Sequence, residues 1–301
     1  MAVVINTNVD SLKIQGLLTN STSKMSQSMQ RMSSGLKILS AKDDAAGTVI
    51  SAKMQVQLNG NQIAQKNVQN ANALLSTAEG NLDVIEDNVS RIRDLTLQAK
   101  NGTYSNEEIK AMQDEVEQRI AEINRINNSA EYSSLRLFGD DAGLAKNGAT
   151  FQVGADAGVD NTITADESLF AKVTFSAMTK IGTKTFNLQD IAKNDGTFSV
   201  DGKTKGTGET DFDVAIRALD DAINNITDRK SIIGSAGNRM DSALATLTTQ
   251  YENLSSAKSI ITDADIASEA SSFTQQQILQ QVSTSLLAQA NQAPAIALSL
   301  V

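Results

Sequence analysis

The residues of this chain that could do chemistry are carboxylates, because the sequence contains neither histidine nor cysteine. Histidine is the commonest general base and metal ligand, and cysteine supplies thiolate nucleophiles and thiolate metal sites. Asp43 and Asp44 are adjacent, and Asp263 and Asp265 flank a break in the helical pattern near the other end of the chain. Paired carboxylates can bind a cation or share acid–base work. No other ligand type accompanies either pair, so we expect both pairs to cap helices.

The other acidic features offer no better site. The turn cluster at 139–143 lacks the spaced ligands of a calcium loop, and the sequence contains no phosphate-binding or dinucleotide-binding glycine motif. Taken by pattern alone, the charged residues around Arg91 and Glu115 are typical of a solvated helix face. The sequence therefore predicts a protein that is not an enzyme and that holds no cofactor and no metal.

Composition limits the partners and the fold. The 301 residues carry a net charge of −9, which disfavours nonspecific binding to nucleic acid and to anionic membranes. Only 4% of the residues are aromatic and tryptophan is absent, so we do not expect a densely packed globular core. The lack of cysteine suits an oxidising exterior. The first residues show no basic region followed by an apolar one, so we expect no cleaved secretory signal.

Most of the chain carries the spacing of coiled-coil helices. Apolar residues that alternate at four and three positions predict one helix over about 45–100, on the order of 80 Å long and ended by Asn101-Gly102. A shorter helix follows it, and the pattern returns after about residue 212. The residues that carry the spacing are Ala64, Val68, Ala71, Leu75, Ala78, Leu82, Ile85, Val89 and Ile92, then Ile109, Met112, Val116, Ile120 and Ile123, and finally Ile216, Leu219, Ile223, Ile226, Met240, Leu244, Leu247, Tyr251, Leu254 and Ile261.

The middle of the chain, 139–211, has a different composition. It holds ten of the 18 glycines, and short alternating segments at 150–153, 172–175 and 197–200 lie between turn residues. Such segments are typical of β-hairpins. The order of helices, β region and helices predicts a mainly α fold, in which a long antiparallel coiled-coil bundle is built from both chain ends, with a small β region at one end of the bundle.

The two chain ends have apolar stripes that need a partner. Residues 270–301 contain no charged side chain, yet seven glutamines interrupt the apolar residues too often for a membrane span. Each end gains little on its own relative to a backbone ordering cost of about 1–2 kcal/mol per residue. We therefore expect these ends to order only when several copies share a core. The stripes consist of Met25, Met29, Met32, Leu36 and Leu39 at the N-terminal end, and of Leu279, Val282, Leu286, Ala293, Ile296 and Leu300 at the other.

These segments together resemble bacterial flagellin. The resemblance rests on Asn6-Thr7-Asn8, on residues 32–47 (MSSGLKILSAKDDAAG), and on the C-terminal run from Ile260 through 277–281 (QILQQ) and 287–292 (LAQANQ) to Leu300. It covers about 1–140 and 212–301. The middle matches only at 151–154 (FQVG), as in a short form without large outer domains, and Val301 stands where the family has leucine.

The resemblance implies a structural subunit of the extracellular flagellar filament, which is exported unfolded and uncleaved by the flagellar type III system. It implies terminal helices 1–42 and 266–301 in the inner core, a rod of 43–138 and 212–265, and an outward-facing region 139–211. The partners implied are further copies of the chain, an export chaperone at about 262–301, and the filament cap and hook-junction proteins. The polymerisation surface would consist of Met25, Met29, Met32, Leu36, Leu39, Leu279, Val282, Leu286, Ile296 and Leu300.

A further implication concerns a host receptor. Flagellins recognised by the vertebrate Toll-like flagellin receptor use an Arg, a Leu and a Gln on one rod helix and a Glu on the next. Arg91, Leu95, Gln98 and Glu115 occupy the matching positions here.

Two other kinds of protein stay open at this point. A hook–filament junction protein, or another axial component of the flagellum, shares the terminal helices. A coiled-coil sensor or secretion-tip protein would carry a membrane span or a ligand pocket, and the sequence indicates neither.

Overall fold

The computed structural model describes residues 7–138, 144, 148–171 and 211–298, with side chains described as far as residue 292. The chain divides into two compact units. Unit 1 consists of residues 1–59 and 250–301, and unit 2 of residues 60–249. Two long helices, α2 (Ala45–Lys100) and α8 (Asp211–Thr262), each contribute to both units.

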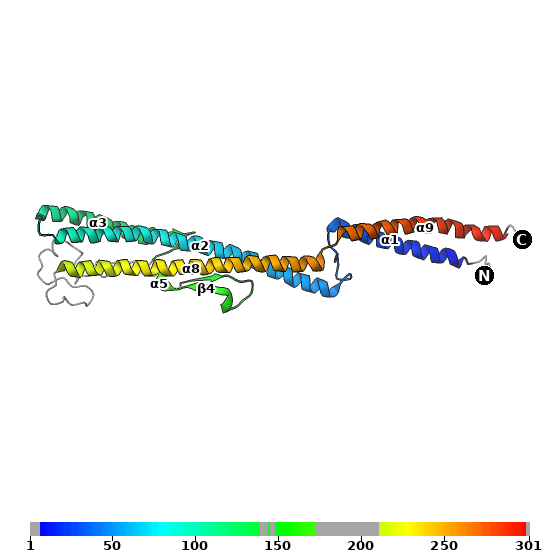
Figure 1. Cartoon of the computed structure of the whole chain (residues 1–301), viewed down its shortest axis with the longest axis horizontal. Coiled ribbons are helices and arrows are strands. Elements are labelled where there is room, and N and C mark those ends of the chain that lie inside the picture. The colour runs from blue at the N-terminus through cyan, green and yellow to red at the C-terminus, as the bar shows by residue number, and fades with distance from the viewer. Residues whose placement is uncertain (1–6, 139–143, 145–147, 172–210, 299–301) are drawn as a thin grey trace. The chain divides into compact units, whose positions relative to one another are not determined.

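Unit 2 is built on a bundle of α2, α3 (Asn106–Ser129) and α8, in which α2 and α8 run in opposite directions (Figure 1). The expected coiled-coil positions form its core: Val68, Leu82, Ile85, Val89 and Ile92 on α2 are fully buried. Val116 and Ile123 of α3 and Leu219, Ile226 and Met240 of α8 complete it. The periodicity therefore identified the core correctly.

A row of polar pairs fixes the register of α2 against α8 in unit 2. From one pair to the next, the partner on α2 moves forward by as many residues as the partner on α8 moves back. All pairs therefore share one antiparallel register. The row consists of Asn72 with Asp241, Asp83 with Lys230, Arg93 with Asp220, and Lys100 with Asp213. A shifted register would separate these partners, although it would keep the apolar pattern in phase after a whole heptad.

Lys230 of this row contacts two carboxylates, because its ammonium group lies 2.6 Å from Asp83 and 2.8 Å from Glu86. These carboxylates raise the pKa of Lys230. We expect Lys230→Met to lower the free energy of unfolding by less than about 1 kcal/mol, since the group is partly exposed. Lys230→Glu should lower the free energy of unfolding further, because it places three carboxylates together. Adding Asp83→Lys to the Lys230→Glu variant should partly restore the stability. Urea unfolding followed by circular dichroism measures this, and equal midpoints for Lys230→Glu and the wild type would contradict it.

The β region is small. The strands β1 (Glu131–Tyr132) and β2 (Leu135–Arg136) form one hairpin, and β3 (Ala149–Gln152) pairs with β4 (Thr162–Ala165) in another. Between β3 and β4 lies the short 3₁₀ helix η1 (Val159–Asn161), and the one-turn helix α5 (Glu167–Phe170) follows.

The β3–β4 hairpin lies alongside α2, and not at one end of the bundle as the sequence suggested. Asn67 of α2 donates a hydrogen bond to the carbonyl of Gln152 at 3.4 Å. A Cβ atom at Gly60 would lie 2.7 Å from the Cβ of Ala155, so glycine permits this close approach. The order of the elements along the chain could not predict this position, because a hairpin can fold back along the helices that flank it. The segments 172–175 and 197–200, also expected to be strands, lie outside the described residues.

Unit 1 contains α1 (Val9–Ser34) and α9 (Ile266–Leu298), which lie side by side and antiparallel (Figure 1). Helix α1 ends earlier than the stripe suggested, because Gly35 adopts a left-handed conformation (φ 71°) and donates its N–H to Arg31. Leu36 and Leu39 therefore lie in the connection to α2. That connection is held by hydrogen bonds from the Lys37 N–H to Thr262 (2.7 Å) and from the Ala264 N–H to Gly35 (2.9 Å).

Asp44 and Asp265 cap helices, as expected, whereas Asp43 caps the turn before α2, and Asp263 accepts hydrogen bonds from the Ser259 and Thr262 hydroxyls at the end of α8. The Asp43 carboxylate accepts hydrogen bonds from the Leu39 and Ser40 N–H groups and from the Ser40 hydroxyl, and these bonds to Ser40 lower the pKa of Asp43. Asp44 accepts from the Gly47 N–H at the start of α2 (2.9 Å), and Asp265 accepts from the Ala267 N–H at the start of α9 (2.9 Å). The carboxylate oxygens of Asp44 and Asp265 thus accept hydrogen bonds from backbone N–H groups that have no partner within the first turn of the helix.

Candidate interaction surfaces

The seam between α1 and α9 is lined mainly by small and polar residues. Ser11, Ser21 and Ser28 are the buried residues of α1, and Ser283 is the buried residue among the described side chains of α9. Phe273 and Leu287 of α9 are half-buried. A seam of this composition removes little apolar surface from water, so it contributes less stability than the heptad core of unit 2.

Specific polar contacts hold the two helices together. The Asn8 amide donates to the carbonyl of Ala290 (2.8 Å), and the Ser11 hydroxyl donates to the Asn291 side-chain oxygen (2.9 Å). The complementary charges of the two chain ends meet where the guanidinium of Arg31 lies 3.2 Å from the Glu269 carboxylate. These contacts specify which faces pair.

The described part of the apolar stripe of α9, Leu279, Val282 and Leu286, does not face α1. Leu279 is 42% exposed, Val282 48% and Leu286 47%, and the adjacent Ile278 is also exposed. Ala270 and Ile278 line a shallow depression on this surface, together with Leu279 and Gln275. We call Ile278, Leu279, Val282 and Leu286 the outer α9 stripe. The prediction that the first 40 residues pair with this end is confirmed, but the outer α9 stripe stays open to water.

The expected N-terminal residues lie in two environments. Met25 and Met32 are half-buried on the helix face that also carries Ser21 and Ser28, whereas Met29 is 51% exposed. Leu36 and Leu39 are each 39% exposed. The side chains of Ile296 and Leu300 lie outside the described part of the structure.

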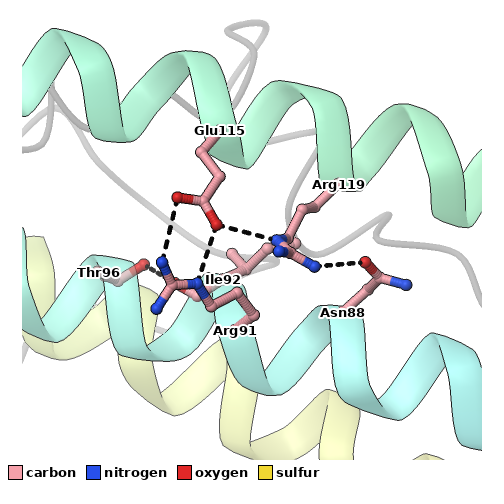
Figure 2. A network of polar contacts seen from close by, with 6 residues as sticks. All are labelled: Asn88, Arg91, Ile92, Thr96, Glu115 and Arg119. Carbon is pink, nitrogen blue, oxygen red and sulfur yellow. Dashed lines mark hydrogen bonds and ion pairs between the residues drawn. The ribbon is translucent and has the colours of Figure 1, made fainter.

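A second surface is the polar network between α2 and α3 (Figure 2). The guanidinium of Arg91 donates two hydrogen bonds to the Glu115 carboxylate, at 2.9 and 3.2 Å. Arg119, one turn further along α3, also donates to Glu115 (3.2 Å), and its other end donates to the Asn88 side-chain oxygen (3.1 Å). Figure 2 shows Glu115 held between the two guanidinium groups, so the network presents a fixed arrangement of charges.

The four residues expected at the receptor surface are not equally accessible. Arg91 and Glu115 touch each other and are partly exposed, and Gln98 is exposed two turns further along α2. Leu95 is only 2% exposed and belongs to the core of unit 2. Its position was expected to be a contact, but in this chain Leu95 packs inside, so it can act on that surface only by supporting it. Arg119 and Asn88 complete the network and were not singled out as site residues.

The ionisation of Glu115 should make this network sensitive to acid. The hydrogen bond from Arg91, followed by that from Arg119, lowers the pKa of Glu115 below its ordinary value of 4.5. The stabilisation is therefore present above pH 4.5 and is lost as the pH falls through the lower pKa of the folded state. We expect Glu115→Gln to cost less than about 1 kcal/mol at neutral pH and nothing in strong acid. Unfolding midpoints of both proteins across pH test this, and a cost that grows in acid would contradict it.

Two kinds of site are missing from the described part of the chain. Among those residues, no three aspartates or glutamates lie close enough together to hold a metal ion. None of the described helices has the length and hydrophobicity needed to cross a bilayer.

Comparison with known proteins gives a consistent result over both chain ends. Residues 5–142 match the model of the bacterial flagellin N-terminal helical region, and residues 216–301 match that of the C-terminal helical region. The flagellin of Serratia marcescens is 35% identical over 100% of both chains, and that of Bacillus subtilis is 33% identical over 99% of both. A structure from Vibrio parahaemolyticus, described as a flagellar hook-associated protein, aligns with a TM-score of 0.56, covering 73% of this chain and 99% of the other at 16% identity.

Proposed function

The chain belongs to the bacterial flagellins and is a structural subunit of the flagellar filament, and we propose that the outer α9 stripe is a surface through which its copies assemble. The observation that carries this proposal is the exposure of Leu279, Val282 and Leu286 on a helix whose polar face is already paired with α1. A row of large apolar side chains open to water favours burial against another surface.

The lack of charge on α9 supports the same proposal. After Glu269 the helix carries no ionised side chain, and Glu269 itself is paired with Arg31. A packed environment with many neighbouring copies would penalise a desolvated, unpaired charge by several kcal/mol. On the N-terminal side, the exposed Met29, Leu36 and Leu39 would contribute to the same assembly, and Met25 and Met32 would support it from the seam.

Seeded growth tests this function. Filament fragments added to the purified chain should elongate to micrometre length by electron microscopy. Growth that stops after a few subunits would instead indicate an axial component that assembles in few copies, such as a hook–filament junction protein. The relatives from Serratia marcescens and Bacillus subtilis, which align over the whole chain, are flagellins, and the hook-associated protein, at 16% identity, shows the fold alone.

Export and chaperone binding are further parts of the proposal. We propose that the chain leaves the cell unfolded through the flagellar type III channel and that a dedicated chaperone covers residues 262–301 beforehand. The outer α9 stripe is the feature that such a chaperone would need to shield. In the filament, cap and hook-junction proteins would contact the same terminal helices at the two ends of the assembly.

The α2–α3 network supports recognition by the Toll-like flagellin receptor. Arg91, Glu115 and Gln98 would make the contact, with Leu95 supporting them from the core. We expect Arg91→Asp to reduce activation of reporter cells strongly, because it removes both hydrogen bonds to Glu115 and places two carboxylates together.

Arg125→Asp is the matched control, since Arg125 is an exposed arginine of α3 that pairs with Glu122 outside the network. Unchanged activation by Arg91→Asp, or an equal loss with Arg125→Asp, would remove this assignment.

A further inference from the structure

The turn between α2 and α3 contains a chemical feature that assembly does not use. The sequence has three Asn-Gly pairs, at 59–60, 101–102 and 147–148. Asn147 lies outside the described residues, and the other two pairs occupy opposite environments. We infer that Asn101 is a site of spontaneous deamidation, whereas Asn59 is protected from the same reaction by the fold.

The reaction needs only the chain and water. The backbone nitrogen of the following residue attacks the side-chain amide carbon of asparagine, which forms a C–N bond and closes a five-membered succinimide ring. The bond between this carbon and the side-chain amide nitrogen then breaks. The nitrogen leaves as ammonia and carries the proton that the backbone N–H has lost. Water then opens the ring at either carbonyl and gives aspartate or isoaspartate.

At Asn101 the geometry permits this attack. Residues 101–108 are all exposed, and α2 ends at Lys100, so Asn101 and Gly102 lie outside any regular helix. A Cβ atom placed at Gly102 would have no atom within 4 Å apart from its chain neighbours, so the space around this backbone is open. The turn is closed by a long hydrogen bond of 3.4 Å from the Tyr104 N–H to the Asn101 carbonyl. Such a segment can reach the bent conformation that ring closure requires.

At Asn59 the same dipeptide is restrained. It lies inside α2, where the backbone nitrogen of Gly60 takes part in the helical hydrogen-bond pattern and its dihedral angles are fixed. The Asn59 side chain accepts a hydrogen bond from Gln55 at 2.8 Å, and Gly60 faces Ala155 closely. The attacking nitrogen and the target carbon therefore cannot meet without local unfolding.

The product would place a new carboxylate at a sensitive position. Residue 101 follows the last residue of α2, and negative charge is unfavourable at the C-terminal end of a helix dipole. It also adjoins Lys100, which pairs with Asp213 in the row that fixes the register of α2 and α8. Isoaspartate would in addition lengthen the backbone of the turn between α2 and α3.

Peptide mapping by mass spectrometry tests the inference on the full-length protein. After incubation in mildly alkaline buffer, the peptide with Asn101 should show the mass increase from amide to acid at a rate at least an order of magnitude above that of Asn59. Gly102→Ala should slow the reaction at Asn101, and in denaturant the two sites should react at similar rates. Equal rates in the folded protein, or no effect of Gly102→Ala, would overturn the inference. None of these outcomes depends on whether the protein polymerises.

Discussion

Replacing Val282 with glutamate should prevent filament growth while leaving the subunit folded. Val282 lies in the outer α9 stripe and is 48% exposed, so a glutamate there stays hydrated in the free chain and costs little. Within an assembled apolar interface the same carboxylate would lose its water without gaining a partner. A penalty of about 3 kcal/mol per subunit raises the critical concentration for assembly about 100-fold. Sedimentation of the polymer across protein concentrations measures this.

Gln277→Glu is the matched control. It introduces the same charge on the same helix, and Gln277 is exposed in the free chain. Five residues along a helix place it roughly 140° around the axis from Val282, away from the centre of the stripe. We expect a clearly smaller change in the critical concentration. If both variants assemble like the wild type, the stripe is not an assembly surface. If both fail equally, net charge and not position would explain the effect.

Deleting residues 266–301 should abolish filaments and leave unit 2 intact. The buried core cluster of unit 2 draws its residues from 64–247, and none comes from α1 or α9. Removal of α9 takes away the outer stripe and also the partner of α1, whose buried residues are serines that cannot support a lone helix.

Circular dichroism and electron microscopy separate the two parts of this expectation. The truncated chain should keep the thermal transition of the unit 2 helices while losing the helical signal of α1 and α9. No filaments should form, even on seeds. Filaments from the truncated chain would show that the C-terminal helix is dispensable, and loss of the unit 2 transition would show that the two units do not fold independently.

The heptad pattern predicted the long helices well because burial in a coiled coil repeats in the sequence. Val68, Leu82 and Ile92 lie where the spacing placed them, and α2 begins and ends where expected. Capping was predictable for a similar reason, since Asp44 and Asp265 act on backbone groups only a few residues away.

What the sequence did not reveal depends on contacts between distant segments. Leu95 lies one heptad after Asn88 and three heptads after Leu74, on a second buried face of α2 that a two-helix pattern does not require. Arg119 of α3 contacts Asn88 on this face. The sequence could not show that Leu95 is buried on this face.

The outer α9 stripe is a second feature whose contacts the sequence did not reveal. Periodicity identified an apolar face on the C-terminal helix, but it could not state which partner covers that face. The seam with α1 uses the neighbouring face, on which Ser283 is buried and Gln280 donates a hydrogen bond to the Thr22 hydroxyl at 3.4 Å, while the side chains of the stripe stay exposed. An amphipathic pattern predicts that burial occurs, and only the structure separates burial within the chain from burial between chains.

Thiol accessibility tests most directly whether the outer α9 stripe is buried by assembly. The chain has no cysteine, so Leu286→Cys introduces a single thiol in the stripe, and Val159→Cys introduces one on the β region, where Val159 is 88% exposed. Both thiols should react rapidly with a maleimide in the free subunit. In filaments we expect Leu286→Cys to be protected while Val159→Cys still reacts, because we propose that the β region faces outward there. Equal labelling of Leu286→Cys in subunits and filaments would contradict the assignment of this surface to assembly.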